Sequence, residues 1–400
     1  MVHLAVILVL MAYPAIYTAL KNSPVGTEAM TLLPQVETMI PVFYFGLFAM
    51  SFDFISGYTG YLSFGHAAFY GTGAYFVILT ANDKVPFLPA NTPFMISLVV
   101  AGLLAVVLAL AIGSVSFRLT GVYFAMITLG FAQVLYVFVS GWDYVGPNPH
   151  DGILVNGPAG LNIGVPGIDS LNLAIGALTG DTVSLGFVHL DQTGVSYYMV
   201  GLVVLVCYFA MQRIIHSPFG KVMIAIRENE ERAIAVGYNT FHYKLGAFAI
   251  SAFFAAIAGG LLAGYQRTVS PDGTFNFLVA GDALLASIIG GFGTLAGPLY
   301  GQLFDESVRE FLSKEAQGVG LLPYLRDHLG AGVMGTTIYN GLTVQGAIET
   351  FLNGHADLYV GALFVLFVLF VPNGLLGTLR DRLGGPVAKT LPEHVRRYLR

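Results

Sequence analysis

The chain has 400 residues, of which 56% are hydrophobic and only 10% are charged, whereas an ordinary soluble domain carries about 25% charged residues. So little charge excludes a soluble globular protein, and the net charge of −5 argues against nucleic acid as a partner. A single cysteine, Cys207, excludes an internal disulfide and a cysteine-based zinc site. The composition therefore predicts an all-α polytopic membrane protein.

Ten stretches are apolar enough to cross a bilayer as helices, which takes about 20 residues at a rise of about 1.5 Å per residue. The first stretch lacks the basic start of a signal peptide and is interpreted as a membrane span. The eighth and ninth are short and rich in glycine, so tilted, broken or re-entrant helices are an alternative there. In chain order the stretches are 2–20, 39–56, 62–80, 94–117, 121–140, 195–213, 245–265, 276–291, 295–311 and 357–373.

Lysine and arginine set the expected orientation, because they are enriched on the cytoplasmic side of membrane proteins. They gather in 214–244 and in the tail 374–400, whereas 141–193 contains neither and carries aspartates. We therefore expect 214–244 and the basic tail in the cytoplasm and 141–193 outside the membrane. Ten spans within 1–373, with both chain ends in the cytoplasm, satisfy these placements and put 312–356 outside.

The two outer segments have different compositions. The segment 141–193 is rich in Gly, Pro, Asn and Asp, the residues of turns. It forms either a cap over a translocation path or a docking surface for an external partner, or else it is a tolerated loop insertion. The segment 312–356 has mixed charge and is compatible with short interfacial helices.

The segment 214–244 contains a short helix-like stretch that ends in a glycine. Glu231 stands about one and a half helical turns before Gly237. Such a helix, leading into a span, can act as a lever that a soluble partner pushes; the alternative is a solvated loop that only joins two spans. We expect Glu231 and Arg232 to be exposed, Ala233 to press into the partner, and Gly237 to end the helix in a left-handed conformation.

Small residues recur at helical spacing in several stretches, and in lipid they let helix backbones approach closely. The positions expected at helix contacts are Gly65, Gly71, Gly293, Gly297 and Gly301. Most of them can be ordinary packing positions. The total of 49 glycines nevertheless indicates many close helix crossings and broken helices near a pathway.

Five runs within residues 40–305 carry a family resemblance. They are GYTGYLSFGHAAFYGTGAY at 57–75, RLTGVYFA at 118–125, SPFGKVMIAIRENE at 217–230, the span 244–260, and GGFGTLAGPLYG at 290–301. In this order they resemble the permease subunits of branched-chain amino acid ABC importers, and within that family the LivM type rather than its LivH-type partner. The segments 141–193 and 312–356 look longer than the family pattern.

The resemblance implies a multi-pass subunit of the cell membrane that carries leucine, isoleucine or valine by alternating access. Its expected partners are a LivH-type permease, two cytoplasmic ATPase subunits and an extracytoplasmic substrate-binding protein. ATP would be used by the partners, and we expect no cofactor, metal or catalytic site in this chain. Gly220 and Lys221 are followed by Val222 and lack the preceding glycine of a phosphate-binding loop of the form GxxxxGK(S/T). The stretch containing Glu231, Arg232, Ala233 and Gly237 would then contact an ATPase.

Two alternatives stay open from the sequence: a permease of the same wider family for urea or short amides, and an ion-coupled secondary transporter. The latter needs ionisable residues deep in the membrane. Asp53, His66 and Asp282 are candidates, although each is expected to cap a helix or to bond a neighbouring backbone group.

Mildly polar side chains on two spans are candidates for the translocation path. They are Ser63 and His66 in the stretch 62–80, and Thr128 and Gln133 in the stretch 121–140. Their spacing is compatible with inward-facing positions, but it leaves open which helix faces line the path.

Overall fold

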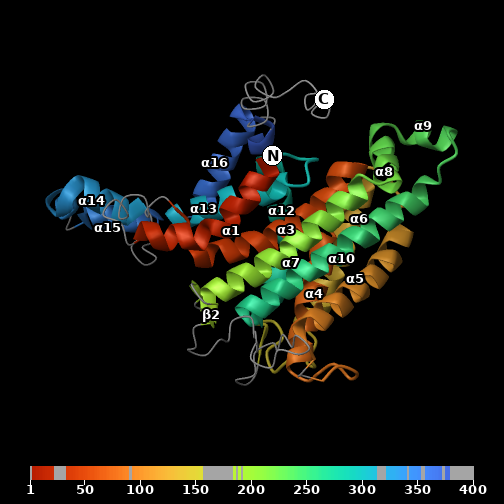
Figure 1. Cartoon of the computed structure of the whole chain (residues 1–400), viewed down its shortest axis with the longest axis horizontal. Helices are drawn as coiled ribbons and strands as arrows, with labels where there is room; N and C mark the ends of the chain where they lie inside the picture. Colours follow the sequence, from red (N-terminus) through yellow and green to blue (C-terminus); the bar gives the residue numbers. More distant parts are fainter. Residues whose placement is uncertain are drawn as a thin grey trace.

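The structure is a computed structural model that describes residues 2–21, 33–89, 92–155, 183–185, 188–190, 192–312, 321–339, 342–352, 356–371 and 374–378. It is almost entirely helical (Figure 1). The helices are α1 (Val2–Lys21), α3 (Val36–Thr59), α4 (His66–Ala81), α5 (Phe94–Ser116), α6 (Val122–Ser140), α7 (Gln192–Ile215), α8 (Pro218–Glu228), α9 (Glu230–Ala235), α10 (Thr240–Gln266), α11 (Pro271–Thr274), α12 (Phe277–Gly290), α13 (Gly297–Leu312), α14 (Leu321–Met334), α15 (Val344–Leu352) and α16 (Ala356–Phe370).

Short antiparallel strand pairs connect some of the helices. The pairs are β1 (Ile153–Leu154) with β4 (Thr268–Val269), β2 (Val183–Leu185) with β3 (Val188–Leu190), and β5 (Thr337–Tyr339) with β6 (Leu342–Thr343). Only the first pair joins segments that are far apart in the sequence, since it links the segment after α6 to the end of α10.

Seven helical stretches in the described part of the chain are long and apolar enough to cross a membrane. They confirm the predicted all-α polytopic membrane fold and agree with seven of the ten predicted stretches. The seven are Val36–Thr59, Phe94–Ser116, Val122–Ser140, Thr193–Ile215, Thr240–Gln266, Pro271–Gly290 and Leu358–Thr378.

The other three predicted stretches have less clear counterparts. In α1 the shorter apolar part Val9–Leu20 is found, and α4 has only 16 residues because the chain from 60 to 65 is not helical. The 16-residue α13 carries charged side chains through its second half. The total of ten spans and the cytoplasmic position of both ends therefore remain predictions, and most of 141–193 and of the tail 374–400 lies outside the described residues.

The centre of the bundle is α10, which packs against α3, α4 and α5. Its crossing with α4 is so close that it requires glycine on both helices. A β-carbon added at Gly259 would lie 1.9 Å from the carbonyl oxygen of Tyr70, and one added at Gly73 would lie 2.0 Å from that of Ala256. The two backbones therefore touch directly, and any side chain at these positions would separate them.

A second close crossing joins α12 to α13. A β-carbon at Gly301 would lie 1.8 Å from the carbonyl oxygen of Ala286, and one at Gly290 would lie 1.7 Å from that of Gly297. Gly290 and Gly73 were not among the residues predicted at helix contacts.

Of the other glycines predicted at contacts, two face neighbouring elements directly. Gly65 lies against the backbone of Thr128 on α6, and Gly71 lies against the ring of Phe275. Gly293 belongs to the turn before α13, where its φ of +79° favours glycine.

Replacing Gly259 by Ala should destabilise the protein, because the new methyl group needs space that the Tyr70 backbone fills. We expect a loss of about 1–3 kcal/mol, in the range of overpacked cores, and a lower melting temperature in detergent. Gly130 on α6 is the matched control, since a β-carbon there meets nothing within 4 Å. Equal melting temperatures for Gly259→Ala and Gly130→Ala would contradict the close crossing.

Candidate functional site

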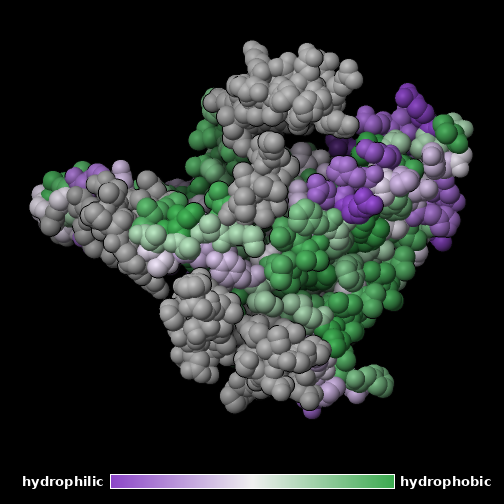
Figure 2. All heavy atoms as spheres, in the orientation of Figure 1, coloured by the Kyte–Doolittle hydropathy of each residue, from purple (hydrophilic) through white to green (hydrophobic). Residues whose placement is uncertain are grey.

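The segment between α7 and α10 folds into two short helices, α8 and α9, which lie at one corner of the molecule (Figure 1). Ser217 caps α8 by accepting a bond from the Gly220 N–H at 3.5 Å, with Pro218 as its first residue. Asn229 caps α9 by accepting from the Arg232 N–H at 2.8 Å. Figure 2 shows that this corner is hydrophilic, in contrast to the apolar surface beside it.

Gly237 ends the short helix α9 in a paired hydrogen-bond pattern. Its N–H donates to the Ile234 carbonyl at 2.9 Å, and the Tyr238 N–H donates to the Ala233 carbonyl at 3.1 Å. These two bonds and a φ of +98° at Gly237 form the glycine-dependent helix terminus known as a Schellman motif. A β-carbon at Gly237 meets nothing within 4 Å, so the backbone angle, rather than lack of space, favours glycine.

The outward face of α9 differs from the one predicted. Glu231 and Arg232 are exposed, as expected. Ala233, however, is buried in a small cluster with Val222 and Ile226, packed by Tyr243. The expectation that Ala233 presses into a partner does not hold in this structure, because the helix turns this small side chain inward. The apolar side chains exposed here are instead Ile234 and Val236, with exposed fractions of 55% and 72%.

Glu230 joins α9 to the membrane helices through a buried cation. Lys244 of α10 is 4% exposed, and its Nζ donates to Glu230 Oε1 at 2.6 Å and to the Tyr61 hydroxyl at 2.9 Å. The Tyr61 hydroxyl donates to Glu230 Oε2 at 2.7 Å, and Thr240 Oγ1 donates to Oε1 at 2.9 Å. One carboxylate therefore ties together α9, the start of α10 and the turn between α3 and α4. We call Glu230, Lys244, Tyr61 and Thr240 the Glu230 cluster.

The charge state of the Glu230 cluster follows from these bonds. Partial burial alone would raise the pKa of Glu230, but the bonds from Lys244, Tyr61 and Thr240 outweigh it and lower that pKa below its ordinary value. Glu230 is therefore a carboxylate at neutral pH. Its contribution to stability is present above the ordinary pKa of a glutamate and is lost as the pH falls through the lowered value.

A second contact joins α8 to the end of α3. Arg227 Nη1 donates a short hydrogen bond to the Gly57 carbonyl oxygen. Asp53, one turn earlier on α3, accepts from the Gly293 N–H at 2.9 Å, which confirms the expected bond from Asp53 to a backbone group. A β-carbon at Gly57 would lie 2.8 Å from Gly293 Cα. The loop helices, α3 and the turn before α13 thus meet at one place.

The predicted path residues lie in packed protein rather than beside an open channel. Ser63, His66 and Thr128 are fully buried and Gln133 is partly buried. His66 Nε2 is hydrogen-bonded to Ser251 Oγ. Four aromatic rings surround the imidazole, those of Phe48, Phe52, Phe69 and Phe248. Within the described chain, no three His, Cys, Asp or Glu side chains gather as metal ligands would.

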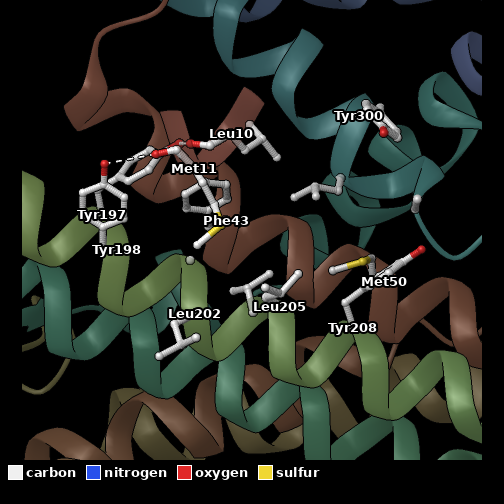
Figure 3. A pocket seen from close by; sticks show the side chains of 14 residues that line it. Leu10, Met11, Phe43, Met50, Tyr197, Tyr198, Leu202, Leu205, Tyr208 and Tyr300 are labelled. Atoms are coloured by element: carbon white, nitrogen blue, oxygen red, sulfur yellow. Dashed lines mark hydrogen bonds between the residues drawn. The ribbon is translucent and has the colours of Figure 1, made fainter. Parts of the chain in front are cut away.

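A cavity of about 120 Å³ lies between α1, α3, α7 and the start of α13 (Figure 3). Its lining is almost wholly apolar, and the hydroxyls of Tyr197 and Tyr198 are directed at carbonyl oxygens of α1. None of the predicted path residues lines it. The full lining is Leu10, Met11, Phe43, Met50, Tyr197, Tyr198, Gly201, Leu202, Val204, Leu205, Tyr208, Ala296, Leu299 and Tyr300.

Sequence reasoning missed the Glu230 cluster and the Arg227 contact. Glu230 and Lys244 are separated by a helix terminus, so no helical spacing pairs them. One signal was available: Lys244 stands at the start of an apolar span, where a charge requires a partner.

Glu230→Gln and Lys244→Met should destabilise the protein non-additively, because each change removes the same ion pair, in which Lys244 is buried and Glu230 is partly buried. We expect a coupling energy of about 1–3 kcal/mol from a double-mutant cycle on the denaturant unfolding of the purified chain. The control pair is Asp305 and Arg309, which are bonded at 2.8 Å one helical turn apart and should couple by about 0.5 kcal/mol or less. Strict additivity for Glu230 and Lys244 would show that the pair does not form.

Comparison with known proteins places these features in a family. The family model "Branched-chain amino acid transport system / permease component" matches residues 36–313. The chain is 26% identical over 344 residues to the high-affinity branched-chain amino acid transport system permease protein LivM of Escherichia coli K12, covering 84% of this chain and 68% of that protein. LivM of Salmonella typhimurium LT2 is also 26% identical, over 87% of this chain and 71% of the relative.

The LivH permease protein of Salmonella typhimurium LT2 is more distant, with 22% identity over 83% of this chain and 91% of the relative. No solved structure matches the chain significantly. The family match covers more than half of the sequence, including the helices that carry the Glu230 cluster and both close glycine crossings. The chain therefore belongs to the family of permease components of branched-chain amino acid transport systems.

Proposed function

We propose that this chain is the LivM-type permease subunit of an ATP-driven importer for leucine, isoleucine and valine in the cell membrane. The observation that carries the proposal is the family match over residues 36–313, together with LivM relatives over more than four fifths of the chain. The proposed partners are a LivH-type permease, two cytoplasmic ATPase subunits that consume the ATP, and an external substrate-binding protein. This chain supplies no ATPase site and binds no cofactor of its own.

The proposed role of α8 and α9 is to receive the movement of the ATPase subunits. The exposed side chains of Glu231, Arg232, Ile234 and Val236 form the contact surface in this proposal. From there, force reaches α10 and the α3–α4 turn through the Glu230 cluster. The direct backbone contacts between α10 and α4 then move these helices together, which alternating access requires.

The orientation of the chain in the membrane is part of the same proposal. The excess of lysine and arginine in 214–244 supports a cytoplasmic position for α8 and α9. Since α10 crosses the whole bundle, its far end, Gln266, then lies on the outer side, and so does the β1–β4 pair.

Transport by the reconstituted complex tests the function. Proteoliposomes containing both permeases and the ATPases should take up radiolabelled leucine, isoleucine and valine only with ATP on the ATPase side and the binding protein on the other. The purified chain alone should hydrolyse no ATP. Uptake of urea or a short amide in place of leucine would instead assign the alternative substrate class. Leucine uptake driven by a proton gradient without any partner would show an ion-coupled secondary transporter.

Variants of α9 test the coupling role. Gly237→Val forces a β-branched residue into a left-handed conformation and should distort the helix terminus, and Val236→Asp places a charge on the exposed apolar surface. Both should reach the membrane at normal levels yet weaken ATPase co-purification and reduce leucine uptake about tenfold or more. The tenfold loss expected for Val236→Asp assumes that the apolar contact of Val236 with the ATPase contributes about 1.5 kcal/mol to binding.

Glu228→Gln is the matched control for these two variants, because Glu228 is exposed and lies just before α9. It should retain uptake. Ala233→Trp is unsuitable as a test, since it would disrupt the internal cluster of the loop. Wild-type uptake by Gly237→Val and Val236→Asp, at wild-type abundance, would mean that the segment only connects two spans.

A further inference from the structure

Arg267 occupies a fixed position at the end of α10 opposite the Glu230 cluster. Figure 1 shows α10 running from α8 and α9 across the bundle to the side that carries β2. The Arg267 N–H donates to the Ala263 carbonyl at 2.9 Å, and its own carbonyl accepts from the Val155 N–H at 3.0 Å. Its φ of 57° is left-handed, which is uncommon for a residue with a side chain. The backbone that presents this guanidinium is therefore held from both sides.

The guanidinium of Arg267 lacks hydrogen-bond partners where it is buried. Nε and Nη2 are both closed to solvent, and neither has an acceptor in the described part of the chain. Leaving buried donors of a permanently charged group without acceptors is unfavourable. Two other cations differ in this respect. Lys244 is paired with Glu230, and Lys84 Nζ donates to the Val145 carbonyl at 2.7 Å and to the Tyr144 carbonyl at 2.9 Å.

The two unpartnered nitrogens indicate the kind of ligand. Nε–H and one N–H of Nη2 point in parallel from one edge of a guanidinium, and that edge matches the two oxygens of a carboxylate. A free branched-chain amino acid carries one carboxylate, whatever its side chain. A residue that binds this group would therefore serve leucine, isoleucine and valine alike.

We propose that Arg267 binds the α-carboxylate of the transported amino acid at the outer end of the path. This inference rests on the proposed importer function and orientation. A small ligand fits the observation better than an acidic side chain of the external binding protein. Arg267 is only partly buried, but its Nε and Nη2 are closed to solvent, so a ligand reaches them only when the site opens, and a free amino acid needs a smaller opening than a docked protein surface.

The β1–β4 pair is the element that would open. It consists of two residue pairs, Ile153 with Val269 and Leu154 with Thr268, directly after Arg267. So short a ladder is a weak closure, since isolated two-stranded pairing is marginal in water. Its separation would free the chain on the C-terminal side of Arg267 while α10 continues to hold the N-terminal side.

Equilibrium binding to the full membrane complex tests the proposal. Both permeases with their ATPases, in nanodiscs and without binding protein, are titrated with radiolabelled L-leucine and, in competition, with L-leucinamide, which lacks the carboxylate. The wild-type complex should bind leucine more tightly than leucinamide. Arg267→Gln should weaken leucine binding about tenfold or more and leave leucinamide unchanged. Arg267→Lys keeps the charge but lacks the two parallel donors. Its affinity for leucine should lie between those of the wild type and of Arg267→Gln.

Lys84→Gln is the matched control, because it removes a cation from the same side of the bundle but one whose donors are already satisfied. It should not change leucine binding. Basal ATPase activity and size-exclusion profiles show that each variant is folded. If Arg267→Gln is misfolded, Arg267→Lys alone decides: leucine affinity equal to wild type overturns the proposal.

Three further results would also overturn the proposal: no leucine binding by the wild-type complex, equal binding of leucine and leucinamide, or an Arg267→Gln effect confined to the affinity for the binding protein. The last would assign Arg267 to protein docking. These results are distinct from a failure of the importer function. If the wild-type complex takes up leucine with its binding protein, the function stands whatever Arg267 does; if it takes up no branched-chain amino acid, the function itself fails.

Discussion

The ammonium group of Lys244 is buried at one end of an apolar helical bundle, and it has to be paired there. Removing one partner from a buried ion pair leaves an uncompensated charge, which is strongly destabilising. Glu230 is the carboxylate that meets this requirement, at 2.6 Å, and the Tyr61 hydroxyl bonds to both groups. The position of α9 is consequently fixed to α10 by charge, although the apolar contact of α9 with the rest of the loop is small.

The ion pair between Glu230 and Lys244 links α9 to the whole bundle, because α10 is in direct contact with its neighbouring helices. Its backbone touches that of α4 at Gly259 and Gly73, where no side chain intervenes. Close-packed elements without voids transmit displacement rather than absorb it. Ser251 of α10 adds a polar link by donating to the Ser51 carbonyl of α3 at 2.9 Å. In the proposed mechanism, a push on α9 reaches the centre of the bundle through these short, directional contacts.

The membrane fold and the Gly237 terminus could be predicted from the sequence, because apolar runs and a glycine after a short polar helix are local signals. The inward position of Ala233 and the burial of His66 could not. Both depend on how a helix is rotated against distant segments, and the spacing of a single helix does not determine that rotation. The pairing of Glu230 with Lys244 was missed for a similar reason, since a turn lies between them. The charged side chains in the second half of α13 explain why the predicted stretch 295–311 has a less clear counterpart among the apolar helices.

Site-specific crosslinking in the assembled complex would test most directly whether α9 bears on an ATPase subunit. The only natural cysteine, Cys207, is buried and can be replaced by Ala, after which a single cysteine is placed at Val236. We expect a short thiol crosslinker to join Val236→Cys to the ATPase subunit in the intact complex. A cysteine at Phe87, which is 92% exposed in the segment between α4 and α5, should give no such product. Equal yields from the two positions, or none from Val236→Cys, would show that α9 does not contact the ATPase subunit.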